Sequence, residues 1–144
     1  MAISFSINLK KDSDHNELIF LETIENLLGE DYRLYKTIDK YCPVDFRLIF
    51  KDTLHCYLEL KVRENIAPYP NLMIGRSKLK NVKLRFPRTI FCWFCVKTET
   101  LWFIKWRPSL MKSIHNDDTH FIDKTDCETG IDNLVETIKN SWEK

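Results

Sequence analysis

Apolar residues recur along the first part of the chain with the period of a helix. The pattern predicts a helix over residues 14–29, capped by Asp14 and ended by Gly29. Its expected apolar stripe consists of Leu18, Leu21, Ile24, Leu27 and Leu28. On a helical wheel Glu17 lies within that stripe, close to the angle of Leu21 and Leu28. An acid that faces a core is costly unless it has a partner, so Glu17 is a candidate for a functional role.

From residue 31 the pattern changes to a period of two. Three segments, 31–37, 44–50 and 56–63, alternate apolar and polar residues, which indicates an antiparallel meander of three strands. The connection at 51–54 is short enough for a hairpin, so the second and third strands are expected to be neighbours.

After the meander, the sequence predicts one more helix and two more strands. A short basic helix is expected over residues 76–86, because Pro87 disfavours its continuation. Residues 89–97 and 101–106 are typical of densely apolar strands joined by a short turn.

The last segment is expected to end in a helix. Residues 115–130 read as a polar loop with room for one short strand, and residues 131–142 as a helix with one apolar face. The predicted order is α-β-β-β-α-β-β-α. It describes a single domain over residues 1–144, of the α/β (α+β) class, in which helices flank a mixed sheet.

The net charge of +1 hides an uneven distribution. The charged residues among the first thirty-one are mainly acidic, whereas segment 63–88 contains a single acid, Glu64. The basic residues of that segment are Arg63, Arg76, Lys78, Lys80, Lys83, Arg85 and Arg88. A neutral total is therefore compatible with a local basic patch.

Composition argues against several other classes of protein. With three glycines, and with "MIGRSK" lacking the spacing of a P-loop, nucleotide-driven chemistry is not expected. The start of the sequence lacks the pattern of a signal peptide, and no apolar run approaches the length of a membrane span. Five cysteines, an odd number, indicate reduced thiols. We therefore expect a cytoplasmic protein without a membrane partner.

Candidate chemistry concentrates on the second and third strands. If Phe46 and Leu58 share the buried face, Asp45 lies beside Glu59 and Lys61 on the opposite face. Two neighbouring carboxylates raise each other's pKa unless a cation lies between them, and Mg²⁺ prefers such ligands. The alternative is a solvated strand face with a cross-strand ion pair that contributes less than about 1 kcal/mol.

This spacing resembles the core motif of the PD-(D/E)XK nuclease superfamily. Asp45, a thirteen-residue gap and then Glu59-Leu60-Lys61 match the motif, although Pro43 stands one residue earlier than usual. The predicted element order is similar to that superfamily's restriction-endonuclease-like core, α-β-β-β-α-β. The superfamily includes Holliday-junction resolvases, and the segment "YPNLMIGRSKLKN" is similar to the loop and helix that follow this motif in its small phage-type members.

The resemblance implies specific roles for individual residues. Asp45, Glu59 and the Leu60 carbonyl would bind Mg²⁺ or Mn²⁺, and Glu17, with Glu22 as the alternative, would complete the ligand set. Lys61 would activate water or stabilise the phosphate, as a catalytic residue beside Asp45, Glu59 and Glu17. The residues expected to contact DNA are Lys78, Lys80, Arg76, Arg63 and Lys83.

The implied activity is endonucleolytic hydrolysis of DNA that leaves 5′-phosphates, with branched or structured DNA among the substrates. A homodimer is expected where both strands of a duplex or junction are cut. Two alternatives stay open. The first is a catalytically inactive member of the fold that binds nucleic acid or serves as a structural subunit. The second is an α/β protein-interaction module.

Overall fold

The computed structural model describes residues 13–37 and 45–142. Its helices are α1 (Ser13–Leu28), α2 (Arg76–Arg85) and α3 (Ile131–Asn140), with 3₁₀ turns η1 (Pro108–Lys112) and η2 (Lys124–Asp126). Its strands are β1 (Tyr32–Lys36), β2 (Phe46–Phe50), β3 (Thr53–Arg63), β4 (Asn71–Gly75), β5 (Thr89–Cys95), β6 (Thr100–Lys105), β7 (Thr119–Asp123) and β8 (Glu128–Thr129). The predicted mixed α/β class is confirmed.

Six strands form the main sheet, in the order β1-β2-β3-β5-β6-β8. Neighbouring strands are antiparallel except β3 and β5, which are parallel and therefore need a crossover connection. That crossover contains β4 and α2, and β4 forms a separate two-stranded sheet with β7. The crossover thereby brings α2 and the β4–β7 pair next to the centre of the main sheet.

The β2–β3 hairpin sets the register on which the candidate site depends. Lys51 and Asp52 take left-handed conformations, with φ of +46° and +67°, which gives a turn that matches the twist of the two strands. Phe46 then pairs with Leu58, and Asp45 directly precedes β2. The predicted meander and its hairpin are confirmed.

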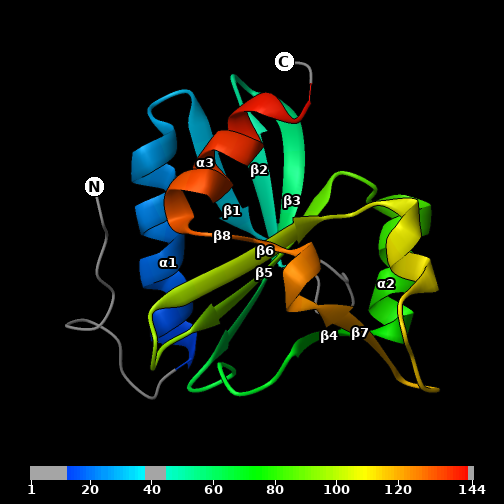
Figure 1. Ribbon diagram of the computed structural model, residues 1–144. Coiled ribbons are helices and arrows are strands. Elements are labelled where there is room, and N and C mark those ends of the chain that lie inside the picture. The colour runs from blue at the N-terminus through cyan, green and yellow to red at the C-terminus, as the bar shows by residue number, and fades with distance from the viewer. Residues whose placement is uncertain (1–12, 38–44, 143–144) are drawn as a thin grey trace.

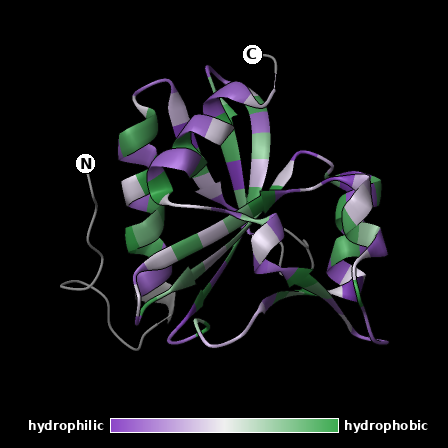
Figure 2. Ribbon diagram, viewed as in Figure 1, coloured by the Kyte–Doolittle hydropathy of each residue, from purple (hydrophilic) through white to green (hydrophobic). Residues whose placement is uncertain are grey.

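Helices cover one face of the main sheet, and a helix with a two-stranded sheet covers the other (Figure 1). The first face packs against α1 and α3 and buries a larger apolar cluster, which includes Phe20, Leu58, Phe94 and Phe103. The second face packs against α2 and the β4–β7 pair, around Phe91 and other apolar residues. Along β2 and β3, hydrophobic and hydrophilic residues alternate (Figure 2), so each strand contributes to both faces.

The predicted apolar stripe of α1 is correct at Ile24 and Leu28 and wrong at Leu18 and Leu27. Phe20, Ile24 and Leu28, spaced four residues apart, are the helix's most buried apolar residues. Leu18 and Leu27, by contrast, are 54% and 37% exposed. The helix is rotated so that Phe20, Ile24 and Leu28 face the sheet, whereas Leu18 and Leu27 point toward solvent.

The structure also adds strands that the sequence did not predict. β4 lies in the segment that was read as loop, and β7 and the two-residue β8 lie where one short strand was expected. Cys56, Cys92, Cys95 and Cys127 are free thiols, and Cys42 lies outside the described residues. Within the described ranges, no helix is both long and apolar enough to cross a membrane.

Candidate active site

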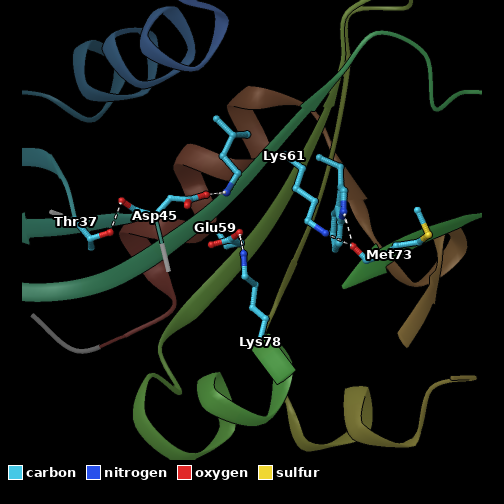
Figure 3. Close-up of polar contacts among 8 residues, drawn as sticks. Thr37, Asp45, Glu59, Lys61, Met73 and Lys78 are labelled. Atoms are coloured by element: carbon cyan, nitrogen blue, oxygen red, sulfur yellow. Dashed lines mark hydrogen bonds and ion pairs between the residues drawn. The ribbon is translucent and has the colours of Figure 1, made fainter. Parts of the chain in front are cut away.

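Asp45 is held at the start of β2 by contacts through both its backbone and its side chain. The backbone carbonyl of Asp45 accepts hydrogen bonds from Thr37 N at 2.8 Å and Thr37 Oγ1 at 3.0 Å. Its carboxylate Oδ2 accepts a hydrogen bond from the Leu60 amide at 3.2 Å. These contacts place the carboxylate over β3, next to Glu59 (Figure 3).

Glu59 is a buried carboxyl group, only 3% exposed, on the second face of the sheet. The Lys78 ammonium donates to Glu59 Oε1, whereas Oε2 is buried with no hydrogen-bond partner among the described residues. Burial, together with the negative charge of Asp45, raises the pKa of Glu59 to about 7, although Lys78 and Lys61 act in the opposite direction. The formal charges of the two carboxyl groups and the two lysines cancel, so burial is the main reason that the charged form of Glu59 is disfavoured.

Lys61 is oriented by the strand that the sequence analysis missed. Its Nζ donates to the carbonyl oxygen of Met73 in β4 at 2.8 Å, and the Trp93 indole donates to the same oxygen at 3.2 Å (Figure 3). Burial, and then the positive charge of Lys78, lower the pKa of Lys61. The amine is therefore fixed in position and easier to deprotonate than an exposed lysine.

Helix α2 supplies Lys78 because its apolar residues fix its rotation. Leu79 and Val82 are buried against the second face of the sheet, which turns the preceding Lys78 toward Glu59. Lys80 and Lys83 are exposed on the same helix. The helix thus directs one lysine into the site and leaves the two others in solvent.

The remaining predicted DNA contacts lie at the start and in the middle of the crossover connection. Arg63 is exposed at the end of β3, and its Nη1 donates to the Val62 carbonyl at 3.0 Å. Arg76 begins α2, and its Nη1 donates to the Asn116 carbonyl at 3.4 Å. The side chains of both arginines contact neighbouring carbonyl groups rather than Asp45 or Glu59.

Glu17 is not gathered into this cluster. It forms an ion pair with Lys36 at 3.6 Å and is 21% exposed in its side chain, so it lies at the margin of the buried surface of α1 rather than at its centre. Glu22 is exposed, and the nearby Glu25 accepts a hydrogen bond from Leu34 N at 2.8 Å. Across residues 13–37 and 45–142, no three acidic, histidine or cysteine side chains converge as a metal-ligand group.

Two carboxylates are nevertheless a sufficient protein contribution for a Mg²⁺ or Mn²⁺ site. Mg²⁺ in proteins is commonly bound through one or two carboxylates, with water and substrate phosphate as the other ligands. The buried, partnerless Oε2 of Glu59 beside Asp45 has the chemistry of such a ligand pair. The residues present therefore fit a divalent cation.

Sequence reasoning found the charged groups of the site but missed the groups that hold them. The Met73 carbonyl, which also accepts a hydrogen bond from the Trp93 indole, fixes Lys61, and Thr37 fixes the backbone of Asp45. A backbone carbonyl has no residue signature, and β4 was read as loop. Thr37 carried a weaker signal, since it is the last residue of the first predicted strand of the meander.

Comparison of sequences with known proteins gave no relationship: no protein-family model and no curated protein matches this chain. Comparison of structures gave a likeness to D212, a nuclease from a fusselovirus. The two chains are 10% identical, with a TM-score of 0.57 over 96% of this chain and 93% of that chain. At this identity the likeness concerns the fold, and it extends over almost the whole of both chains.

Proposed function

We propose that this protein is a Mg²⁺- or Mn²⁺-dependent endonuclease that hydrolyses DNA phosphodiester bonds and leaves 5′-phosphates. The observation that carries the proposal is the buried Glu59, whose Oε2 has no described hydrogen-bond partner, beside Asp45 and between two lysines. The spacing of Asp45, Glu59 and Lys61, and the likeness of the fold to a viral nuclease, support it.

In the proposed reaction Asp45, Glu59 and the Leu60 carbonyl would hold the cation. When bound, a divalent ion polarises a phosphoryl oxygen and lowers the pKa of a coordinated water. Glu17 is left out of the proposed ligand set because it pairs with Lys36. Its omission leaves the remaining positions to water and to the phosphate, as is usual for Mg²⁺.

The lysines supply the other functions. Lys61 Nζ, fixed on the Met73 carbonyl, donates to a phosphate oxygen and stabilises the charge that develops there. Its lowered pKa also makes the neutral amine accessible, so the same nitrogen can accept the proton of the attacking water. The water gives a proton to Lys61, its oxygen bonds to phosphorus as the bond to the sugar 3′-oxygen breaks, and the 3′-oxygen takes up a proton from solvent.

Binding of the DNA backbone is assigned to the basic residues around the site. Lys78 is closest to the reacting phosphate, because it already reaches Glu59 from α2. Lys80 and Lys83, on the exposed side of α2, and the arginines Arg63 and Arg76 would contact flanking phosphates. Contacts of this kind carry affinity without sequence preference and weaken with salt.

A second candidate function is a nucleic-acid-binding or structural subunit without catalysis. The observation that favours it is the ion pair between Lys78 and Glu59, in which a lysine already neutralises one of the two carboxylates. In such a protein Lys78 would take the place of the cation. DNA binding would then persist without metal and without cleavage.

A cleavage panel tests the proposal. Linear, nicked, single-stranded, flapped and four-way DNA would be incubated with Mg²⁺ or Mn²⁺, and the ends of the products identified. We expect metal-dependent cleavage with 5′-phosphate ends, and a loss of about 10³-fold for Glu59→Gln and for Lys61→Ala. Glu30→Gln, which changes an exposed acid outside the site, is the matched control and should keep full activity.

Two results would contradict the proposal in different ways. Binding without cleavage of any substrate, with either metal, would favour the non-catalytic subunit. Cleavage that survives both Glu59→Gln and Lys61→Ala would leave the activity standing and remove the site assignment.

A further inference from the structure

A cavity of about 520 Å³ opens directly beside Lys61. Lys61 and Arg63 of β3 form its charged side, and Trp93 of β5 contributes an aromatic wall that is otherwise buried. This volume lies within the range of small-molecule sites, roughly 300–1,000 Å³. Because Lys61 belongs both to the cavity and to the candidate active site, an occupant of the cavity would lie next to the reacting phosphate.

The other wall of the cavity is built by the β4–β7 pair. Met73 pairs with Phe121 across the two strands, so these side chains project from the same face, while Leu72 and Ile122 are buried on the opposite face. Met73 is 55% exposed and, with the half-buried Phe121, presents apolar surface to the cavity. An exposed apolar wall next to charged residues is typical of a binding surface.

The loop between β3 and β4 closes the cavity with Tyr69, which is 62% exposed. This loop is held in place by Lys124, the residue that follows β7. Lys124 Nζ donates to the carbonyls of Ile66 at 2.6 Å and Ala67 at 3.2 Å. The Tyr69 amide also donates to the Ile66 carbonyl at 3.3 Å. The aromatic ring is therefore presented on an anchored loop.

The cavity combines an apolar interior, an exposed aromatic ring, two cations and the amide of Asn71. A nucleotide has the matching parts: a flat base that stacks on aromatic rings, base edges that hydrogen-bond to amides, and an anionic phosphate. A neutral peptide would cover the apolar surface but would leave the two cations without an anionic partner, and an acidic peptide has no flat base to stack on Tyr69. Charge complementarity therefore favours the nucleotide.

We propose that this cavity holds one unpaired nucleobase next to the scissile phosphate, so that the protein selects DNA with an unpaired nucleotide at the cleavage point. The inference rests on the proposed nuclease function. Tyr69 stacks on the base, Asn71 contacts its edge, and Lys61 and Arg63 bind the adjoining phosphates. Paired bases remain stacked inside the duplex and do not reach the cavity.

Fluorescence of 2-aminopurine tests this inference without requiring cleavage. Two duplex probes, one with a single unpaired 2-aminopurine and one with the same base paired, would be titrated with the full chain in Ca²⁺. We expect tighter binding of the unpaired probe and quenching of its fluorescence. Tyr69→Ala should weaken that binding about tenfold and remove the quenching, while leaving the paired probe unchanged.

Two further variants separate stacking from general disturbance of the fold. Tyr69→Phe keeps the ring and should retain the preference. Tyr35→Ala removes another exposed tyrosine, on β1 and outside the cavity, and should change neither probe.

The outcomes distinguish this inference from the proposed function. Preference for the unpaired probe that depends on Tyr69, in a protein that cuts nothing with Mg²⁺ or Mn²⁺, supports the base cavity and rejects the nuclease. Metal-dependent cleavage with equal effects of Tyr69→Ala on both probes, or none, rejects the base cavity alone. Self-association of the wild type in sedimentation that Tyr69→Ala abolishes would also overturn it, in favour of a protein interface.

Discussion

The two faces of the main sheet are built from the same strands but differ in what they bury. The face toward α1 and α3 buries a continuous apolar cluster that includes Leu58, Phe94 and Phe103. The face toward α2 and the β4–β7 pair contains a smaller apolar cluster and, beside it, the buried Glu59 and the half-buried Lys61. Alternation along β3 thus separates stability and chemistry onto opposite sides of one strand.

We expect the second face to be less stable than an apolar version of it would be. Burial and the repulsion from Asp45 together disfavour the charged form of Glu59, and Lys78 and Lys61 offset these two effects only in part. An arrangement that costs stability and concentrates charge is typical of a functional site. The four predictions below test this contrast, from the largest expected effect to the smallest.

Truncating the apolar face should cause the largest loss of stability. Phe94 is 2% exposed and lies against Phe20, with 6.1 Å between the ring centroids. Phe94→Ala should lower the free energy of unfolding by about 3–5 kcal/mol, because it leaves a cavity in the core. Urea denaturation measures this. Leu84→Ala, at a residue 78% exposed on α2, is the control and should change little.

Neutralising the buried Glu59 should instead raise the free energy of unfolding. The folded protein binds the proton of Glu59 more tightly than the unfolded chain, since the pKa rises from 4.5 to about 7. The stabilisation by that proton is complete below about pH 4.5 and is lost as the pH rises through about 7. Glu59→Gln should therefore stabilise the protein by up to about 3 kcal/mol at about pH 8, and hardly at all at about pH 4.

Thermal unfolding at several pH values measures this difference. A Glu59→Gln variant that is less stable than the wild type above pH 7 would contradict the account, because it would mean that the ion pair with Lys78 outweighs the cost of burial. Glu30→Gln should show no such dependence on pH.

Removing Lys78 should lower the stability of the folded protein, because Glu59 then loses its ion pair. In Lys78→Met the pKa of Glu59 should rise above 7 and the pKa of Lys61 should also rise, since Lys78 lowers both. Stability at about pH 8 should fall by about 1–2 kcal/mol, less than for a fully buried pair because the Lys78 side chain is 30% exposed. Carboxyl titration followed by NMR reports the pKa of Glu59. An unchanged value would show that the pair does not persist in solution.

The smallest effect concerns the exposed lysines. Lys80→Ala and Lys83→Ala should each weaken DNA binding a few-fold and reduce the slope of log K against log salt by about one. Lys139→Ala removes the same charge from α3, on the other side of the sheet, and should leave the slope unchanged. Equal effects at Lys139 and Lys80 would mean that DNA has no preference for the second face.

Much of the fold could be predicted because local patterns are strong there. The meander and its hairpin, the helix α2 and the apolar strands β5 and β6 all follow from alternation or from apolar density in short segments. The strand β4 was not predicted because its partner is distant in the sequence: Asn71 lies opposite Asp123. In addition, a strand of five residues with two buried side chains gives only a weak sequence pattern.

Some residues of the candidate site could likewise be predicted from the sequence, and others could not. Asp45 and Glu59 could be placed together because a hairpin enforces their adjacency, and Lys78 because it follows in the next helix. The rotation of α1 was predicted only in part, because tertiary packing selects Phe20, Ile24 and Leu28 rather than every leucine. Glu17 lies on the same side of the helical wheel, but near the N-terminal end of α1, where it pairs with Lys36. The rotation of a helix depends on what it packs against, and a single sequence does not contain that information directly.

The central claim is that Asp45 and Glu59 form a site for a divalent cation on the second face. Calorimetric titration of the protein with Mn²⁺ at about pH 8, repeated with Glu59→Gln and Glu30→Gln, tests it most directly. The account predicts binding to the wild type and to Glu30→Gln, tighter as the pH rises through about 7, and none to Glu59→Gln. Equal binding by Glu59→Gln, or no binding by the wild type, would contradict it.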